Sequence, residues 1–141
     1  MKLYRSKGFT LIELMLVVII ISILAAMVMP RLAGRTKQAR IAAATSDIES
    51  NIASALDLYE LDNGAYPTTE EGLEALLEKP ASAKSWRGPY VKKKPVDPWG
   101  NPYIYKYPGT HKLDYDLYSR GKDGVEGGED DITNWDEPAS K

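Results

Sequence analysis

Cysteine is absent from the 141 residues of the chain. Disulfides, zinc fingers and thiol nucleophiles are therefore excluded, and the protein must be stabilised in some other way. Histidine is nearly absent as well: His111 is the single one, and it lies in a predicted turn with no nucleophile or metal-ligand motif around it. This scarcity argues against the hypothesis of a membrane-anchored enzyme.

A surplus of positive charge is also missing, since the formal net charge at pH 7 is −2. The C-terminal part is acidic and has no basic stripe of the kind that binds phosphates, so nucleic acid is not expected as a partner. Basic residues instead flank an apolar segment near the N-terminus: Lys2, Arg5 and Lys7 precede it, and Arg31, Arg35, Lys37 and Arg40 follow it.

That apolar segment, residues 9–29, is interrupted only by Thr10, Glu13 and Ser22. At about 1.5 Å per residue it is long enough to cross a hydrocarbon core of roughly 30 Å as a helix. A cleaved secretory signal is the alternative, but its apolar core would be only about 7–15 residues long and would end at a small-residue cleavage site. Because basic residues lie on both sides, charge does not decide the orientation.

The predicted helix continues into an amphipathic part, residues 31–63. Pro30 and Gly34 predict a kink or local unwinding at the junction, because proline removes one helical hydrogen bond. Asn63 and Gly64 form a typical helix stop. Between these signals, apolar residues recur at spacings of three and four on one face: Ile41, Ala44, Ile48, Ile52, Ala55, Leu56 and Tyr59.

Residues 64–141 are predicted to form one small globular domain. Thr68 and Glu71 have capping-box spacing ahead of a short helix, which Pro80 ends. The segment that follows, up to residue 103, is expected to be an ordered loop, and residues 104–107 and 115–119 are predicted to be the strands of a hairpin. The large aromatic residues of the loop are expected to anchor the core rather than to form a ligand cage: Trp86, Tyr90, Trp99 and Tyr103.

The C-terminal stretch, residues 119–136, combines glycines with clustered carboxylates. Asp123, Asp130 and Asp131 suggest a loop folded around a hard cation such as Ca²⁺, although the spacing is not that of an EF-hand. A solvated acidic tail is the alternative, since runs of charge usually are solvated. Ile132 and Trp135 argue against a free tail, because they are expected to pack back onto the domain.

The N-terminal segment resembles the processing site of type IV pilins and of the pseudopilins of type II secretion, since residues 7–13 read KGFTLIE. This resemblance implies that a prepilin peptidase cleaves between Gly8 and Phe9 on the cytoplasmic side and methylates the new N-terminus of Phe9. It implies that Glu13 pairs with the amino group of Phe9 in a neighbouring subunit. Such a pairing is physically reasonable, because two charges desolvated together attract, whereas either alone is costly to bury.

The remainder of the chain resembles the major pseudopilins of type II secretion. The matching segments are Tyr66-Pro67-Thr68, Gly72-Leu73, Trp86-Arg87-Gly88-Pro89-Tyr90, Asp97-Pro98-Trp99-Gly100-Asn101-Pro102-Tyr103, Ser119, Gly121, Asp123-Gly124, Gly127-Gly128 and Asp131-Ile132. The resemblance implies a Ca²⁺ site with the side chains of Asp123, Asp130 and Asp131 and the backbone carbonyls of Arg120 and Val125 as ligands.

The fold implied by this resemblance is the α+β, type IV pilin-like fold. A long N-terminal helix, whose lower half spans the membrane, packs on a small domain with a short helix, an antiparallel β-sheet and an ordered C-terminal loop. Residues 1–8 would be a removed leader, residues 9–30 a transmembrane and filament-core helix, residues 31–63 its amphipathic continuation and residues 64–141 the periplasmic domain.

The function implied is that of a structural subunit and not of an enzyme. Subunits anchored in the bacterial inner membrane would polymerise through their N-terminal helices into a periplasmic pseudopilus that drives folded proteins across the outer membrane. The implied partners are further copies of the chain, minor pseudopilins, the prepilin peptidase, inner-membrane assembly platform proteins and a secretin channel. The alternative is a type IV pilus major pilin for adhesion or motility, but many such pilins carry a C-terminal disulfide.

Overall fold

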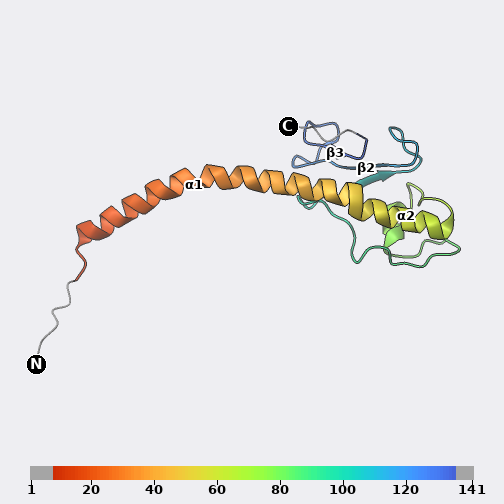
Figure 1. The fold of residues 1–141 in the computed structure, drawn as a ribbon, viewed down its shortest axis with the longest axis horizontal. Coiled ribbons are helices and arrows are strands. Elements are labelled where there is room, and N and C mark those ends of the chain that lie inside the picture. The colour runs from red at the N-terminus through yellow and green to blue at the C-terminus, as the bar shows by residue number, and fades with distance from the viewer. Residues whose placement is uncertain (1–7, 136–141) are drawn as a thin grey trace, which may run out of the picture. The chain divides into compact units, whose positions relative to one another are not determined.

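A computed structural model describes residues 8–135, except for the side chains of residues 28–33 (Figure 1). Contacts divide the chain into two units, Met1–Gln38 and Ala39–Lys141. Helix α1, Leu11–Ser46, runs through Pro30 and Gly34 as continuous α-helix. The local unwinding expected there is therefore absent, because the loss of one hydrogen bond leaves the other backbone bonds of a long helix intact.

A π-helical turn, η1, interrupts the α-helical run at Asp47–Asn51, and α2 follows over Ile52–Asn63. The sequence gives a reason for the wider turn. Buried residues Ala44, Ile48 and Ile52 are spaced four apart, which exceeds the 3.6 residues of an α-helical turn, so a wider turn returns them to one face. The predicted stop is confirmed, because Gly64 has a left-handed φ of 83° and its N–H bonds to the carbonyl of Glu60.

The short helix predicted after residue 68 is a 3₁₀ helix, η2, over Gly72–Leu76. Its capping box is confirmed: the N–H of Glu71 lies 3.3 Å from Thr68 Oγ1, and the N–H of Thr68 lies 2.9 Å from Glu71 Oε2. A single tight turn is typical of a 3₁₀ helix, whose hydrogen bonds are poorer than those of an α-helix and whose runs stay short.

The sheet has three antiparallel strands in the order β1-β2-β3. The predicted hairpin is confirmed by β1, Ile104–Lys106, and β2, Asp116–Ser119, with Tyr105 opposite Leu117. The third strand, β3, Ile132–Thr133, pairs with the end of β2 and was not predicted. A strand of two residues is too short to show alternation in the sequence, so only its pairing defines it.

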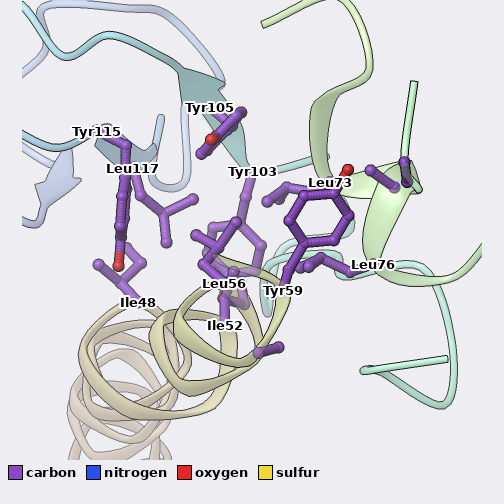
Figure 2. Packing of buried hydrophobic residues seen from close by; sticks show 13 residues of the cluster. Ile48, Ile52, Leu56, Tyr59, Leu73, Leu76, Tyr103, Tyr105, Tyr115 and Leu117 are labelled. Atoms are coloured by element: carbon purple, nitrogen blue, oxygen red, sulfur yellow. The ribbon is translucent and has the colours of Figure 1, made fainter. Parts of the chain in front are cut away.

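The core of the second unit lies between one face of the η1–α2 segment, helix η2 and the sheet, as Figure 2 shows. Ile48, Ile52 and Leu56 of the helical segment are at most 3% exposed. They pack with residues of η2 and the sheet in one cluster that includes Leu73, Leu76, Tyr103, Tyr105, Tyr115 and Leu117. The core-anchor prediction is confirmed for Tyr103, which is buried, and for Trp86 and Tyr90, which pack against the cluster. Trp99 remains partly exposed.

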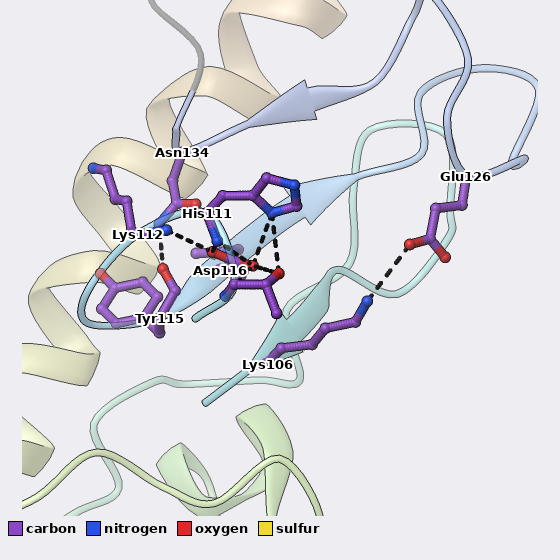
Figure 3. Close-up of polar contacts among 9 residues, drawn as sticks. Lys106, His111, Lys112, Tyr115, Asp116, Glu126 and Asn134 are labelled. Carbon is purple, nitrogen blue, oxygen red and sulfur yellow. Dashed lines mark hydrogen bonds and ion pairs between the residues drawn. The ribbon is translucent and has the colours of Figure 1, made fainter. Parts of the chain in front are cut away.

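A buried carboxylate, Asp116, organises the turn between β1 and β2 (Figure 3). The residue is 1% exposed, and its oxygens accept hydrogen bonds from the backbone N–H groups of Thr110, His111 and Lys112 at 2.8 to 3.2 Å. The hydroxyl of Thr110 donates at 2.6 Å, and His111 Nδ1 lies 3.0 Å from the same oxygen. One side chain thus fixes a turn that has no regular secondary structure.

Two opposing effects act on the pKa of Asp116. Burial tends to raise it, but the hydrogen bonds from Thr110, His111 and Lys112 outweigh burial and hold the pKa well below its ordinary value. The unfolded chain therefore takes up this proton first as the pH falls. Asp116 contributes stability above the ordinary carboxyl pKa, and this contribution is lost at more acid pH.

We expect Asp116→Asn to lower the free energy of unfolding at pH 7 by about 2–3 kcal/mol, because an amide cannot accept all of these hydrogen bonds. The difference from the wild type should shrink as the pH falls below about 4. Denaturant unfolding of the full chain in detergent, followed by tryptophan fluorescence, measures both. Asp114→Asn, at an exposed position two residues away, is the control. An equal loss in both variants, or a difference independent of pH, would contradict the assigned role.

Candidate functional site

Gly8 and Phe9 lie in non-helical backbone just before α1. Thr10 begins the helix: its hydroxyl lies 3.3 Å from the backbone N of Glu13, and its carbonyl accepts the N–H of Leu14 at 3.2 Å. This N-cap was missed in the sequence, although Thr10 and Glu13 have the spacing of a capping box. The predicted cleavage point therefore lies in non-helical chain just ahead of a capped helix.

Both residues of the predicted intersubunit pair are exposed in the single chain. The side chain of Phe9 is 78% exposed, and Glu13 is exposed in the first turn of α1. A carboxylate in this position interacts favourably with the positive end of the helix dipole. Glu13 is thus compatible with the helix start and accessible to a group of another molecule.

The helix surface beyond Glu13 is apolar on all sides. The eight consecutive residues 14–21 are between 45% and 59% exposed, and at 3.6 residues per turn they cover every face of the helix. The described part of α1, taken alone, contains no helical stretch long and apolar enough to cross a membrane. The span predicted from the sequence includes residues 28 and 29, whose side chains lie outside those described.

The start of the C-terminal loop, residues 120–131, is anchored by buried polar side chains. Asp97 and Ser119 are 3% and 0% exposed, and the Ser119 hydroxyl donates to Asp97 Oδ2 at 2.7 Å. The other oxygen of Asp97 accepts the N–H groups of Trp99 and Asn101. The N–H of Gly121 in turn lies 3.1 Å from Ser119 Oγ. This chain of contacts joins the loop before β1 to the start of the C-terminal loop.

Carboxylates within the C-terminal loop bind its own backbone. Asp130 Oδ2 accepts the N–H groups of Lys122 and Asp123, at 2.7 and 3.2 Å. Asp131 Oδ2 accepts the N–H of Gly127 at 2.7 Å, and Asp123 Oδ1 accepts the N–H of Val125 at 2.9 Å. The segment is therefore a folded loop and not the solvated acidic tail that the sequence left open.

Oxygen atoms converge at Gly128. A Cβ built there would lie 2.9 Å from Asp130 Oδ1, 3.2 Å from Asp123 Oδ2 and 3.6 Å from the Val125 carbonyl. The structure thus brings three of the predicted ligand groups together, through carboxylate oxygens other than those that accept the backbone N–H groups above. A side chain at position 128 would displace the carboxylate of Asp130.

The other two predicted ligand residues are Asp131 and Arg120. Asp131 Oδ1 is buried without a hydrogen-bond partner, as is Arg120 Nε, and neither Asp131 nor the Arg120 carbonyl is among the three nearest atoms to the Gly128 position. Across the described residues, no three histidine or acidic side chains form a group that could hold a metal ion.

Two family models together match most of the chain. Residues 31–135 match the family model described as type II secretion system protein G, and residues 3–29 match the prokaryotic N-terminal methylation motif. The type II secretion system core protein G of Pseudomonas aeruginosa is 55% identical over 139 residues, covering 94% of this chain and 96% of that protein. Its Escherichia coli counterpart is 48% identical, covering 93% and 92%.

A solved structure agrees with these relatives. The crystal structure of the major pseudopilin from the type 2 secretion system of enterohaemorrhagic Escherichia coli matches with a TM-score of 0.65 and 42% identity, covering 75% of this chain and 95% of that one. The resemblance and the α+β fold inferred from the sequence are confirmed, and the pilus alternative is not supported. The chain belongs to the type II secretion system protein G family, the major pseudopilins, which are structural subunits of the pseudopilus.

Proposed function

We propose that this chain is held in the inner membrane by residues 9–30, is cleaved between Gly8 and Phe9, and polymerises through α1 into a periplasmic pseudopilus. The observation that carries the proposal is the apolar surface on every face of residues 14–21. A helix that is apolar all round is stable only where something covers all its faces, such as lipid before assembly or neighbouring helices after it. The match of residues 3–29 to the methylation motif supports the same reading.

Glu13 supplies the selectivity of this assembly. A carboxylate inside an apolar environment costs roughly 2.5–3.5 kcal/mol even on lenient insertion scales, so a compensating charge is strongly favoured. Cleavage after Gly8 would create one, the amino group of Phe9. In its own chain this amine stands at the positive end of the helix dipole, which disfavours it, whereas Glu13 of a neighbouring copy offers the opposite charge.

The proposed orientation places residues 1–8 in the cytoplasm and the globular unit in the periplasm. The prepilin peptidase then acts on the cytoplasmic side, and assembly platform proteins of the inner membrane extract the processed subunit. Minor pseudopilins and the secretin channel are the remaining proposed partners, because the pseudopilus must connect the inner membrane with the outer-membrane pore through which folded proteins leave.

We also propose that the C-terminal loop binds Ca²⁺. The oxygens of Asp123, Asp130 and the Val125 carbonyl that surround the Gly128 position are hard donors of the kind this ion takes. Asp131 and the carbonyl of Arg120 are the further proposed ligands. The ion would neutralise carboxylates that otherwise repel each other and so hold the loop closed on the domain.

Gly8→Val should leave the precursor uncut, because a peptidase that reads extended backbone has no space for a branched side chain at this position. A Cβ at Gly8 meets nothing within 4 Å in the chain itself, so folding should be unaffected. Intact-mass analysis of membrane-extracted protein detects the leader. Gly34→Val, also in open space, should be processed normally. A mature N-terminus other than Phe9 in the wild type would show that the cleavage assignment is wrong.

Glu13→Leu should abolish filament assembly while the protein remains in the membrane, because the change removes the partner of the Phe9 amine and makes the helix more apolar. Shearing of cells and crosslinking report filament yield, and membrane fractionation reports retention. Glu78→Leu, at an exposed position of the globular unit, serves as control. A normal filament yield from Glu13→Leu would be incompatible with the pairing.

Calcium should raise the melting temperature of the full chain in detergent by several degrees, since a ligand at a hundredfold excess over its Kd adds about 2.7 kcal/mol to stability. Magnesium should do so poorly, because it requires a tighter octahedral shell and loses its water reluctantly. Melting curves with calcium, magnesium and chelator test this, with Asp123→Asn expected to lose the response and Asp114→Asn to keep it. Identical wild-type curves in all three conditions would refute the site.

A further inference from the structure

The C-terminal loop is a connection between β2, which ends at Ser119, and β3, which begins at Ile132. Its geometry therefore depends on how firmly the chain after the loop is held against β2. The two strands pair at only two positions, Tyr118 with Thr133 and Ser119 with Ile132. So short a pairing contributes few hydrogen bonds, and additional contacts are needed to keep the loop closed.

Asn134 supplies such contacts beyond the end of β3. Its backbone N–H donates to the carbonyl of Leu117, and its side-chain Oδ1 accepts the N–H of Leu117, both at 3.0 Å. Its Nδ2 donates to the carbonyl of Tyr115 at 3.0 Å. The amide side chain of Asn134 thus continues along β2 in the place of further strand residues, as Figure 3 shows beside the turn of Asp116.

Trp135 holds the segment after β3 through contacts of its ring with other side chains. Its ring stacks on His111, with centroids 4.2 Å apart and planes 8° from parallel, and meets the edge of Tyr118 at 5.4 Å. His111 is itself fixed by the buried Asp116. The turn between β1 and β2 therefore provides the ring against which Trp135, the residue after Asn134, packs.

We propose that Asn134, assisted by Trp135, is a positioning residue that keeps the C-terminal loop closed and thereby sets its affinity for the cation. The link to the cation rests on the calcium site proposed above. A ligand that binds only the closed loop has an apparent Kd equal to its intrinsic Kd divided by the closed fraction. A change that opens the loop without touching the ligands then weakens binding by the factor by which it lowers the closed fraction.

Hydrogen exchange of the full chain in detergent measures the closed state directly. The amides of Lys122, Asp123, Val125 and Gly127 bond to carboxylates of the loop and report its opening, whereas the amides of α2 report global unfolding. Asn134→Asp keeps the size of the side chain but replaces the donor at the Tyr115 carbonyl by an oxygen. Asn51→Asp makes the same change at an exposed site on the helical segment, where Nδ2 bonds to Asp47.

In chelator, Asn134→Asp should speed exchange of the loop amides about tenfold, the equivalent of about 1.4 kcal/mol, and leave α2 unchanged. Trp135→Ala should accelerate the same amides, and Asn51→Asp should accelerate none of them. Equal acceleration in the loop and in α2 would show that Asn134 contributes only to global stability. Unchanged loop exchange in both variants would also overturn the proposal.

Calcium titration of the same samples tests the link to affinity. Asn134→Asp should bind more weakly than the wild type by the ratio of the two closed fractions that exchange in chelator gives, and saturating calcium should restore slow exchange. A ratio of affinities that differs from the ratio of the closed fractions would refute the coupling. If the wild type binds no calcium, the metal site and the coupling fall together, while exchange in chelator still decides whether Asn134 holds the loop.

Discussion

The contact on which the globular unit depends is the packing of one helical face against the sheet and helix η2. Ile48, Ile52 and Leu56 are buried there against Leu76, Leu117 and the tyrosines of the sheet. Fully burying an aliphatic side chain contributes about 1.5–3 kcal/mol, and a small domain without disulfides has few other sources of stability. The π turn η1 belongs to this contact, because it keeps residues spaced four apart on the buried face.

Around this core, polar side chains take over the role of regular secondary structure. Asp97 fixes the turn before β1 and receives the hydroxyl of Ser119, Asp116 fixes the turn between β1 and β2, and Asn134 continues β3. Each of them satisfies several backbone groups at once, which a long irregular chain requires if it is to be buried. The same residues connect the candidate cation loop to the core and so hold the loop in an ordered conformation.

The described part of the N-terminal segment differs from this core, because its apolar side chains at residues 14–21 remain exposed. The side chains of residues 14–21 and Glu13 are exposed in the single chain, and the proposed function assigns lipid or other copies of the chain to cover them. One helical run thus carries an exposed apolar surface in one unit and a core face in the other. This division agrees with the proposed function, in which the apolar helix assembles and the globular unit stays folded.

How far the sequence sufficed can be seen from individual residues. The helix stop at Gly64, the capping box of Thr68 and Glu71, the hairpin strands and the helical core stripe from Ala44 to Tyr59 were predicted, because each is specified by neighbours within a few residues. Ile41, the first residue of the predicted stripe, is exposed. The sequence alone also identified the protein family, through the KGFTLIE motif and the turn motifs of the domain. The prediction of local unwinding at Pro30 was wrong, since the helix propensity of one residue does not show how much the helix on either side stabilises the α-helical backbone there.

Tertiary structure decided what depends on residues far apart in the chain. Strand β3 forms because Ile132 pairs with Ser119. Asp116 accepts several hydrogen bonds because the turn between β1 and β2 folds around its side chain. At the candidate cation site the sequence named five ligand groups, but only folding showed which three of them meet at Gly128. Composition and periodicity report local preferences, whereas the convergence of oxygens is set by loop closure, which β3, Asn134 and Trp135 impose from beyond the loop itself.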